Sequence, residues 1–351
     1  MAEQAFSFLD LVNRCDNVII GKPPPPSMPP SAFDDERLIP FHLTPAPDSP
    51  KLGLIRPIVL EQLHAENALN QRKNAPEMWH TITPDRVSFC AWLDTHEKRT
   101  AAMKVLCERW RDDGIFSDVC GPRKWRAELY PVYADPFGAR DHPSDSDGDP
   151  TRLNFVFEME RAACALFGIV TYGVHMTIYE QLVDRSLRIW VPSRAKTKQT
   201  YPGCLDNTVA GGTPSGMSFF EALVKESSED ASLEDDIVRK HARCAGVISY
   251  FIRTSGGWLQ PEVEYVYDLM IPPGADPEPF KPRPSDGEVE CFELLDQDEV
   301  VRRLRAGRFK PNCALVLIDL FMRLGHITPE NEPDYLRIQT RLHGDLCYHS
   351  W

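Results

Sequence analysis

Residues 211–231 decide the fold of this chain and read Gly211-Gly212-Thr213-Pro214-Ser215-Gly216-Met217-Ser218-Phe219-Phe220-Glu221-Ala222-Leu223-Val224-Lys225-Glu226-Ser227-Ser228-Glu229-Asp230-Ala231. The glycines allow the backbone to approach a ligand closely and to adopt conformations that other residues avoid. A helix places Glu226, Glu229 and Asp230 on one face, because they stand at positions i, i+3 and i+4. Hard carboxylate oxygens suit Mg²⁺ or Mn²⁺, which bridge phosphate oxygens and activate water. The stretch therefore predicts a divalent metal site for a pyrophosphate group.

Another acid of this helix, Glu221, has a structural explanation. Ser218 followed by Glu221 three positions later is the pattern of a capping box, in which Glu221 accepts from backbone donors. Glu221 also precedes Lys225 by four positions, which favours an ion pair. We therefore leave Glu221 out of the predicted chemistry. The helical spacing predicts a buried stripe formed by Phe220, Val224, Ser227 and Ala231.

The bulk composition excludes several classes of protein. A length of 351 residues suggests about two domains. The formal net charge of −13 argues against a nucleic-acid partner. No apolar run approaches the ~20 residues that span a bilayer, so no membrane partner is expected. The first residues resemble no targeting signal, and the 10 cysteines show no zinc-ligand spacing. We therefore expect a cytoplasmic protein with reduced thiols.

The rest of the chain mixes helical and strand patterns, which indicates an α+β protein with a mixed sheet between helices. Helices are expected at 6–16, 96–110, 155–167, 298–306 and 312–324. Strands are expected at 87–93, 125–133, 174–180, 187–191, 246–253, 263–271 and 288–295.

Two loops carry motifs with a functional and a plain interpretation. The proline-rich stretch 23–30 fits a partner that reads PxxP segments, but it is interpreted as an extended spacer. Asp145, Asp147 and Asp149 alternate as in a calcium loop. The later ligands and the closing Glu of that motif are missing, so a solvated loop is the better interpretation.

Residues 211–233 resemble the Nudix box, G-x5-E-x7-R-E-U-x-E-E-x-G-U, where U is aliphatic. Gly211 takes the first position, Lys225-Glu226 the R-E step and Glu229-Asp230 the E-E step. The resemblance implies metal ligation by Glu226, Glu229 and Asp230, with Glu226 and Glu229 as catalytic residues. It also implies that Gly211 and Gly212 contact the substrate.

Among the departures from the general box, Met217 replaces Glu, Lys225 replaces Arg, Asp230 replaces Glu and Ser232 replaces Gly. Asp230 keeps a hard ligand with a shorter reach. The early Glu and the Arg pair with each other in many Nudix proteins, and here both are altered together. Met217 can pack against the core instead.

A longer resemblance connects this chain to the Nudix proteins related to thiamine pyrophosphokinase. It is carried by 187–198 and 202–218 and, nearer the start of the chain, by 8–16, 53–57 and 160–168. It implies a family-specific N-terminal mixed α/β domain at 1–167 and a Nudix domain at 168–351, in which a mixed sheet lies between helices. It also implies Mg²⁺-dependent hydrolysis of oxidised thiamine diphosphate analogues to the monophosphate and phosphate.

The alternatives remain open at this point. General Nudix activity includes nucleoside diphosphates with oxidised bases, such as 8-oxo-dGDP. A catalytically silent diphosphate sensor is supported by Met217 and Lys225, and an isoprenoid diphosphate isomerase is a third possibility. The expected partner is a small-molecule diphosphate, and the protein is either a monomer or a homodimer.

Residues outside the box complete the predicted site. Arg194, Lys196 and Lys198 form a local basic patch in an acidic chain and are predicted to bind phosphate. Strand alternation places Glu262, Glu264 and Asp268 on one face. Glu264 is predicted to be an additional metal ligand or a base that activates water. A thiazolium ligand would favour an aromatic wall through cation–π contact.

Overall fold

The computed structural model describes residues 5–20, 28–144, 153–285 and 287–348. It confirms the predicted α+β class, because helices pack against sheets that contain both parallel and antiparallel strands. Within the described residues no helix is both long enough and apolar enough to cross a membrane. The predicted proline-rich spacer falls largely on residues 21–27, and Asp145, Asp147 and Asp149 fall within 145–152, so both lie outside the described residues.

The first half of the chain builds a four-stranded sheet, a two-stranded hairpin and the helices that cover them. The order of the four-stranded sheet is β2-β1-β4-β3. Its strands are β1 (Ile39–His42), β2 (Lys51–Ile55), β3 (Trp79–Thr83) and β4 (Arg86–Phe89), and the hairpin pairs β5 (Leu129–Tyr133) with β6 (Phe155–Glu160). The helices are α2 (Pro57–Arg72), α3 (His96–Asp112), α4 (Ser117–Cys120), the 3₁₀ turn η2 (Arg161–Ala163) and α5 (Cys164–Phe167).

Aromatic rings fill the core of this half. Trp79 stacks on Phe89 with ring centroids 5.0 Å apart, and Trp110 stacks on Phe167 at 5.8 Å. Phe41 meets Trp79 edge-on at 5.6 Å. Such aromatic contacts add to the free energy gained by burying the rings. The core thereby joins the four-stranded sheet to α3 and α5.

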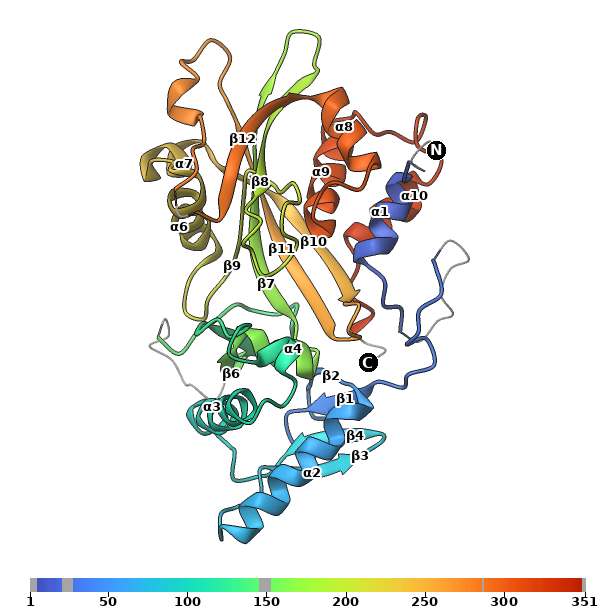
Figure 1. Ribbon diagram of the computed structural model, residues 1–351, viewed down its shortest axis with the longest axis vertical. Coiled ribbons are helices and arrows are strands. Elements are labelled where there is room, and N and C mark those ends of the chain that lie inside the picture. Colours follow the sequence, from blue (N-terminus) through green and yellow to red (C-terminus); the bar gives the residue numbers. More distant parts are fainter. Residues whose placement is uncertain (1–4, 21–27, 145–152, 286, 349–351) are drawn as a thin grey trace.

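The second half is a six-stranded mixed sheet between two layers of helices (Figure 1). The strand order is β10-β11-β7-β8-β12, and β9 pairs with β7. These strands are β7 (Thr171–Gln181), β8 (Leu187–Arg194), β9 (Val209–Gly212), β10 (Arg243–Arg253), β11 (Leu259–Met270) and β12 (Val289–Asp296). One layer contains α6 (Phe219–Ala231) and α7 (Asp235–His241), and the other α1 (Phe8–Cys15), α8 (Gln297–Arg305), α9 (Pro311–Arg323) and α10 (Tyr335–Leu342).

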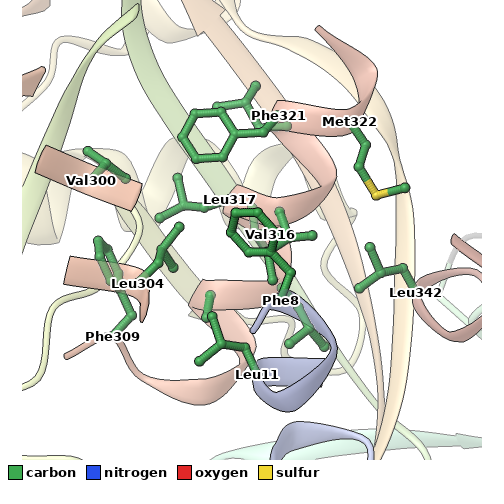
Figure 2. Packing of buried hydrophobic residues seen from close by; sticks show 14 of the residues in the cluster. Phe8, Leu11, Val300, Leu304, Phe309, Val316, Leu317, Phe321, Met322 and Leu342 are labelled. Atoms are coloured by element: carbon green, nitrogen blue, oxygen red, sulfur yellow. The ribbon is translucent and has the colours of Figure 1, made fainter. Parts of the chain in front are cut away.

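The first helix of the chain packs among the last helices. Figure 2 shows Phe8 and Leu11 beside Val316 and Leu317 of α9 in one apolar cluster. The position of α1 is also fixed by Arg341 of α10, whose Nη1 lies 3.0 Å from Asn13 Oδ1. Residues 8–15 therefore share a core with the sheet of the second half. The division of the chain at residues 167 and 168 stays a prediction.

The predicted helix at 155–167 is wrong for its first half. Phe155–Glu160 is strand β6, antiparallel to β5, and only 161–167 are helical. Five of the six residues of β6 are buried, so the apolar run fits a helix and a strand equally well. Pairing with β5 decides for the strand. The other predicted helices and strands are present, with shifted ends. Helix α2 was missed because its 16 residues bury only Val59, Leu63 and Glu66.

His343 links three elements and makes stability depend on pH. Its Nδ1 lies 2.9 Å from the carbonyl oxygen of Val247 in β10, and its Nε2 lies 3.3 Å from Asp319 Oδ1 in α9. The hydrogen bond to Asp319 raises the pKa of His343 above 6.5, although burial and nearby Arg323 oppose the shift. A folded-state pKa above the unfolded value gives stability that is complete below about pH 6.5 and is lost as pH rises through the folded-state pKa.

We therefore expect His343→Gln to flatten the pH dependence of unfolding. Between about pH 6 and pH 8.5 the parent protein should lose a few tenths of a kcal/mol more than the variant, since the group is partly exposed. Urea unfolding at both pH values measures the difference. Equal losses in the two proteins would contradict the assigned ion pair.

Candidate active site

The glycine-rich turn connects the central sheet to α6. In β9, Gly211 pairs with Val174 and Gly212 with Gly173 of β7. The turn that follows is fixed by a hydrogen bond from Thr213 N to Tyr172 O, 3.0 Å long. Gly216 has φ +77°, a left-handed conformation that glycine adopts without strain. Ser218 caps α6 by accepting from Glu221 N at 3.3 Å, so the predicted turn and helix are both present.

Gly211 and Gly212 are needed for close approach rather than for backbone freedom. A Cβ on Gly211 would lie 2.2 Å from Cδ of Glu226, and a Cβ on Gly212 would lie 1.4 Å from Oη of Tyr130. Gly173 is also needed for close approach, because a Cβ on Gly173 would lie 2.2 Å from Oε2 of Glu264. Carboxylates from α6 and β11 thus reach neighbouring parts of the same two strands.

Two of the predicted metal ligands of α6 differ in the exposure of their side chains. Glu226 has a side chain that is 18% exposed, whereas that of Glu229 is 52% exposed. Burial raises the pKa of Glu226, and the nearby charge of Lys225 opposes the shift. The Nζ of Lys225 lies 2.7 Å from Glu229 Oε2 and 3.7 Å from Glu226 Oε1. Lys225 therefore bridges two of the predicted metal ligands.

The side chains of Glu226, Glu229 and Asp230 supply the hard oxygen donors that suit a divalent cation. In the part of the chain that the structure describes, no three His, Cys, Asp or Glu side chains are already grouped to hold a metal ion. The carboxylates of Glu226 and Glu229 instead share the ammonium of Lys225. The assignment of Glu226, Glu229 and Asp230 as ligands stays a prediction.

Glu264 of β11 lies in a buried polar network next to β7. Its Oε1 accepts from Tyr250 Oη at 2.8 Å and from Asn312 Nδ2 at 3.3 Å, and lies 3.5 Å from His175 Nε2. Its Oε2 has no hydrogen-bond partner among the described residues. A carboxylate with one oxygen held and one buried oxygen unpartnered is oriented to receive a ligand.

The network also contains Glu262, whose carboxyl group is in hydrogen-bond contact with the same Tyr250 hydroxyl, which can donate its single proton to only one of the two acids at a time. Burial raises the pKa of Glu262, and the negative charge of Glu264 raises it further. Burial favours the neutral form of Glu264 as well, but the charge of His175 and hydrogen bonds from His175 and Tyr250 outweigh it and lower its pKa. Glu264 is therefore the more readily ionised acid of the two.

A cavity of about 640 Å³ opens between the two halves of the chain. The sheet contributes acids and glycine backbone to its wall, and the first half of the chain contributes cations and aromatic rings. Residues of the sheet side include Gly173, Gly211, Gly212, Tyr250, Glu262 and Glu264, and those of the opposite side include Lys124, Arg126, Tyr130 and Arg161. The volume suits a small-molecule ligand.

The predicted basic patch does not line this cavity, as far as the described residues show. The guanidinium of Arg194 is already engaged, because it lies 2.5 Å from Asp206 Oδ2 and 3.0 Å from Thr200 O. Lys198 pairs with Glu288, and Lys196 is exposed. The structure thus brings Gly211, Gly212 and Glu264 to the cavity, while the phosphate-binding role of the patch stays a prediction.

The predicted partners of Glu221 are wrong. Both carboxylate oxygens bind Arg239 of α7 at 2.7 Å. Lys225 pairs with Glu229 instead of Glu221. Arg239 is farther from Glu221 in the sequence than Lys225 is. It is nevertheless the partner, because its planar guanidinium binds both carboxylate oxygens. Asp268 shares the predicted face of β11 but binds Arg323, with a closest distance of 2.6 Å.

The chain is similar to known proteins in both of its halves. Residues 8–142 match a family described as a domain of unknown function (DUF4743). Nudix hydrolase 20 (chloroplastic) of Arabidopsis thaliana is 34% identical over 312 residues, which cover 85% of this chain and 75% of that protein. The chain belongs to the Nudix hydrolase family.

The chain is also similar to an uncharacterised protein and to several solved structures. An uncharacterised Saccharomyces cerevisiae protein is 38% identical over 66% of this chain, and the match spans 65% of the yeast protein. The solved Nudix-type structures are more distant. The structure of DR0079 from Deinococcus radiodurans has 20% identity and a TM-score of 0.31, covering 42% of this chain and 80% of its own. A C. elegans Ap4A hydrolase has 12% identity and a TM-score of 0.32, covering 45% of this chain and 99% of its own.

We predict that Gly211→Ala displaces Glu226 while the Nudix sheet still folds. The added Cβ meets the end of a flexible side chain, which can move away. We expect Mn²⁺ to bind at least about tenfold more weakly, since the buried ligand loses its place. Isothermal titration with Mn²⁺ measures the affinity, and thermal unfolding controls for the fold. Unchanged Mn²⁺ affinity would show that Glu226 needs no contact with Gly211.

Proposed function

We propose that this protein is a Mg²⁺- or Mn²⁺-dependent hydrolase of small-molecule diphosphates. One observation carries the proposal: carboxylates from α6 and β11 reach the same pair of glycine-containing strands at the wall of a ligand-sized cavity. Glu226, Glu229 and Asp230 would hold the metal ions, and Glu264 Oε2 would supply a further oxygen ligand. A bound metal ion would lower the pKa of a water and neutralise charge on the phosphates.

The proposed reaction breaks one phosphoanhydride bond. The oxygen of water attacks a phosphorus atom in line with the bridging oxygen, which leaves with the other phosphate group. A carboxylate of the site accepts the proton that water loses. The residues of this chain contribute by orienting the ligand acids: Gly211 allows Glu226 to approach, and Tyr250 and Asn312 hold Oε1 of Glu264 so that its Oε2 faces the strands.

As substrates we propose oxidised thiamine diphosphate analogues, which would be cut to the monophosphate and phosphate. The support is the resemblance of the box and its flanks to the Nudix branch related to thiamine pyrophosphokinase. Aromatic side chains are available for a heterocycle, because Tyr172, Tyr201, Tyr250 and Trp258 line the cavity. Nucleoside diphosphates with oxidised bases are the second substrate class, since aromatic walls accept them as well.

The cellular setting is part of the proposal. We propose that the protein acts in the cytoplasm on a small-molecule diphosphate, without nucleic-acid or membrane partners, as a monomer or homodimer. We also propose that residues 1–167 form a family-specific domain and 168–351 the Nudix domain.

We expect Glu226→Gln to lower kcat by about 10²–10⁴-fold, because it removes a charged ligand of the metal and leaves the shape unchanged. Phosphate release from oxidised thiamine diphosphates and from 8-oxo-dGDP, with Mg²⁺ and with EDTA, measures the effect. Glu221→Gln is the matched control, since Glu221 belongs to the same helix but binds Arg239. Equal rates for Glu226→Gln and the parent would mean that the ligands are misassigned. Tight binding without turnover of any diphosphate would favour the silent sensor.

Glu264→Gln tests the second acid. Gln can still accept from Tyr250 and Asn312 through its carbonyl oxygen, but it removes the negative charge next to β7. We expect kcat to fall about tenfold to hundredfold and the Mg²⁺ concentration at half-maximal rate to rise. Asp268→Asn, on the same face of β11 and paired with Arg323, is the control. A Mg²⁺ dependence identical to that of the parent would remove Glu264 from the metal site.

A further inference from the structure

The acids and the glycine backbone of the sheet do not account for binding of all the oxygens of a diphosphate. A diphosphate carries several negative charges, and Glu226, Glu262 and Glu264 are acids beside or within the cavity wall. Metal ions neutralise only the oxygens that they touch, so the remaining phosphate oxygens need donors from the opposite side. The predicted patch at Arg194, Lys196 and Lys198 does not provide them there, within the described residues.

The opposite wall does carry such donors, and they come from the first half of the chain. Arg161 stands directly across from Gly212, since a Cβ on Gly212 would lie 3.1 Å from the guanidinium carbon Cζ. Its side chain is 40% exposed while lining the cavity.

Tyr130 is the second donor. The residue is 3% exposed, and its hydroxyl has no hydrogen-bond partner among the described residues. The hydroxyl reaches the position that a Cβ of Gly212 would occupy, at the cavity wall. The ring is held by Arg161, whose Cζ lies 5.0 Å from the ring centroid. A buried O–H without a partner costs free energy unless a ligand accepts from it.

Hydrogen bonds fix this wall in place before any ligand binds. Arg126 N donates to Glu160 Oε1 at 2.9 Å, and Arg161 N donates to Glu128 O at 2.9 Å. Arg126 is therefore held beside Arg161. Burial and then the charge of Arg161 lower the pKa of Arg126, and the negative charges of Glu128 and Glu160 oppose the shift. The wall is also tied to the glycine turn, because Ser215 N donates to Leu129 O at 2.9 Å.

We propose that Arg161, Arg126 and the Tyr130 hydroxyl form the diphosphate-binding wall of the active site, opposite the acids of the Nudix sheet. The ligand class is a diphosphate group, whose oxygens would accept from the guanidinium groups and from the phenol. The inference rests on the proposed function for its choice of ligand. It assigns part of substrate binding to the half of the chain that precedes the Nudix box, so the box alone makes an incomplete site.

The ion pair between Arg161 and Glu128 provides a sharp test. Arg161 Nη1 lies 2.8 Å from Glu128 Oε2, so a bound diphosphate must compete with Glu128 for the guanidinium. We expect Arg161→Gln to weaken binding of Mg²⁺–imidodiphosphate by about tenfold to hundredfold, and Glu128→Gln to strengthen it several-fold. A residue that only supports the fold would not produce this opposite pair of effects. Isothermal titration of the full chain measures both.

Controls separate the wall from the fold and from the basic patch. Tyr130→Phe keeps the ring and should weaken binding several-fold without lowering the melting temperature, since the hydroxyl has no partner to lose among the residues that the structure describes. The double variant Glu128→Gln with Arg161→Gln leaves no unpaired carboxylate and should bind as weakly as Arg161→Gln. Lys196→Ala tests the competing basic patch: if the wall binds the diphosphate, this exposed cation outside the cavity should matter far less than Arg161.

The outcomes distinguish this inference from the proposed function. If no diphosphate is hydrolysed but imidodiphosphate binding depends on Arg161, the wall is correct and the hydrolase proposal fails. If the protein hydrolyses diphosphates and Arg161→Gln leaves KM and imidodiphosphate affinity unchanged, the wall is refuted and the hydrolase proposal stands. A loss with Lys196→Ala as large as that with Arg161→Gln would also overturn the wall.

Discussion

The contact between side-chain carboxylates and bare backbone is the constraint on which the site depends. Strands β7 and β9 carry glycine at 173, 211 and 212, and in each case the volume of a Cβ is taken by a functional group from another element. Helix α6, strand β11 and strand β5 therefore converge on the same few peptide units. Sheet pairing fixes those peptide units, because Gly173 and Gly212 are partners in the β7–β9 ladder. The position of each functional group is thus set by regular secondary structure rather than by a loop.

Charge is distributed across the cavity in two layers. The sheet contributes the buried acids Glu262 and Glu264, of which Glu264 ionises more readily because, despite its burial, His175 and Tyr250 lower its pKa. The opposite wall contributes the cations Lys124, Arg126 and Arg161, and Lys310 at the start of α9 also lines the cavity. An isolated buried charge is costly, so each layer gains from a ligand that carries the opposite charge toward it. A metal–diphosphate complex has this polarity, with cations on one side and phosphate oxygens on the other.

Sequence patterns predicted the features that depend on residues close together in the chain. They did not predict contacts between residues that are far apart in the sequence. The turn, its helix and the acids Glu226, Glu229 and Asp230 follow from spacing alone. Arg194 looks like a phosphate ligand by type and context, but Asp206 binds it in the folded chain. No sequence signal near Glu221 indicates its pairing with Arg239, which lies 18 positions later in the chain. Tyr130 and Arg161 carry no motif, and only the docking of β5 on the glycine turn brings them opposite Gly212. Strand β6 was predicted as a helix because its partner, β5, is far from it in the sequence.

The place of α1 in the molecule has a consequence for how the chain reaches its native state. Residues 8–15 complete an apolar core with α9 and α10, and Asn13 contacts Arg341, 328 positions later. During synthesis this helix must remain without its native partners until nearly all of the intervening chain has been made. Contacts of such large sequence separation slow folding, because the entropy of closing the loop is lost before the contacts form. The amphipathic segment at the start of the chain is therefore exposed to chaperones and to self-association for longer than any other part of the core.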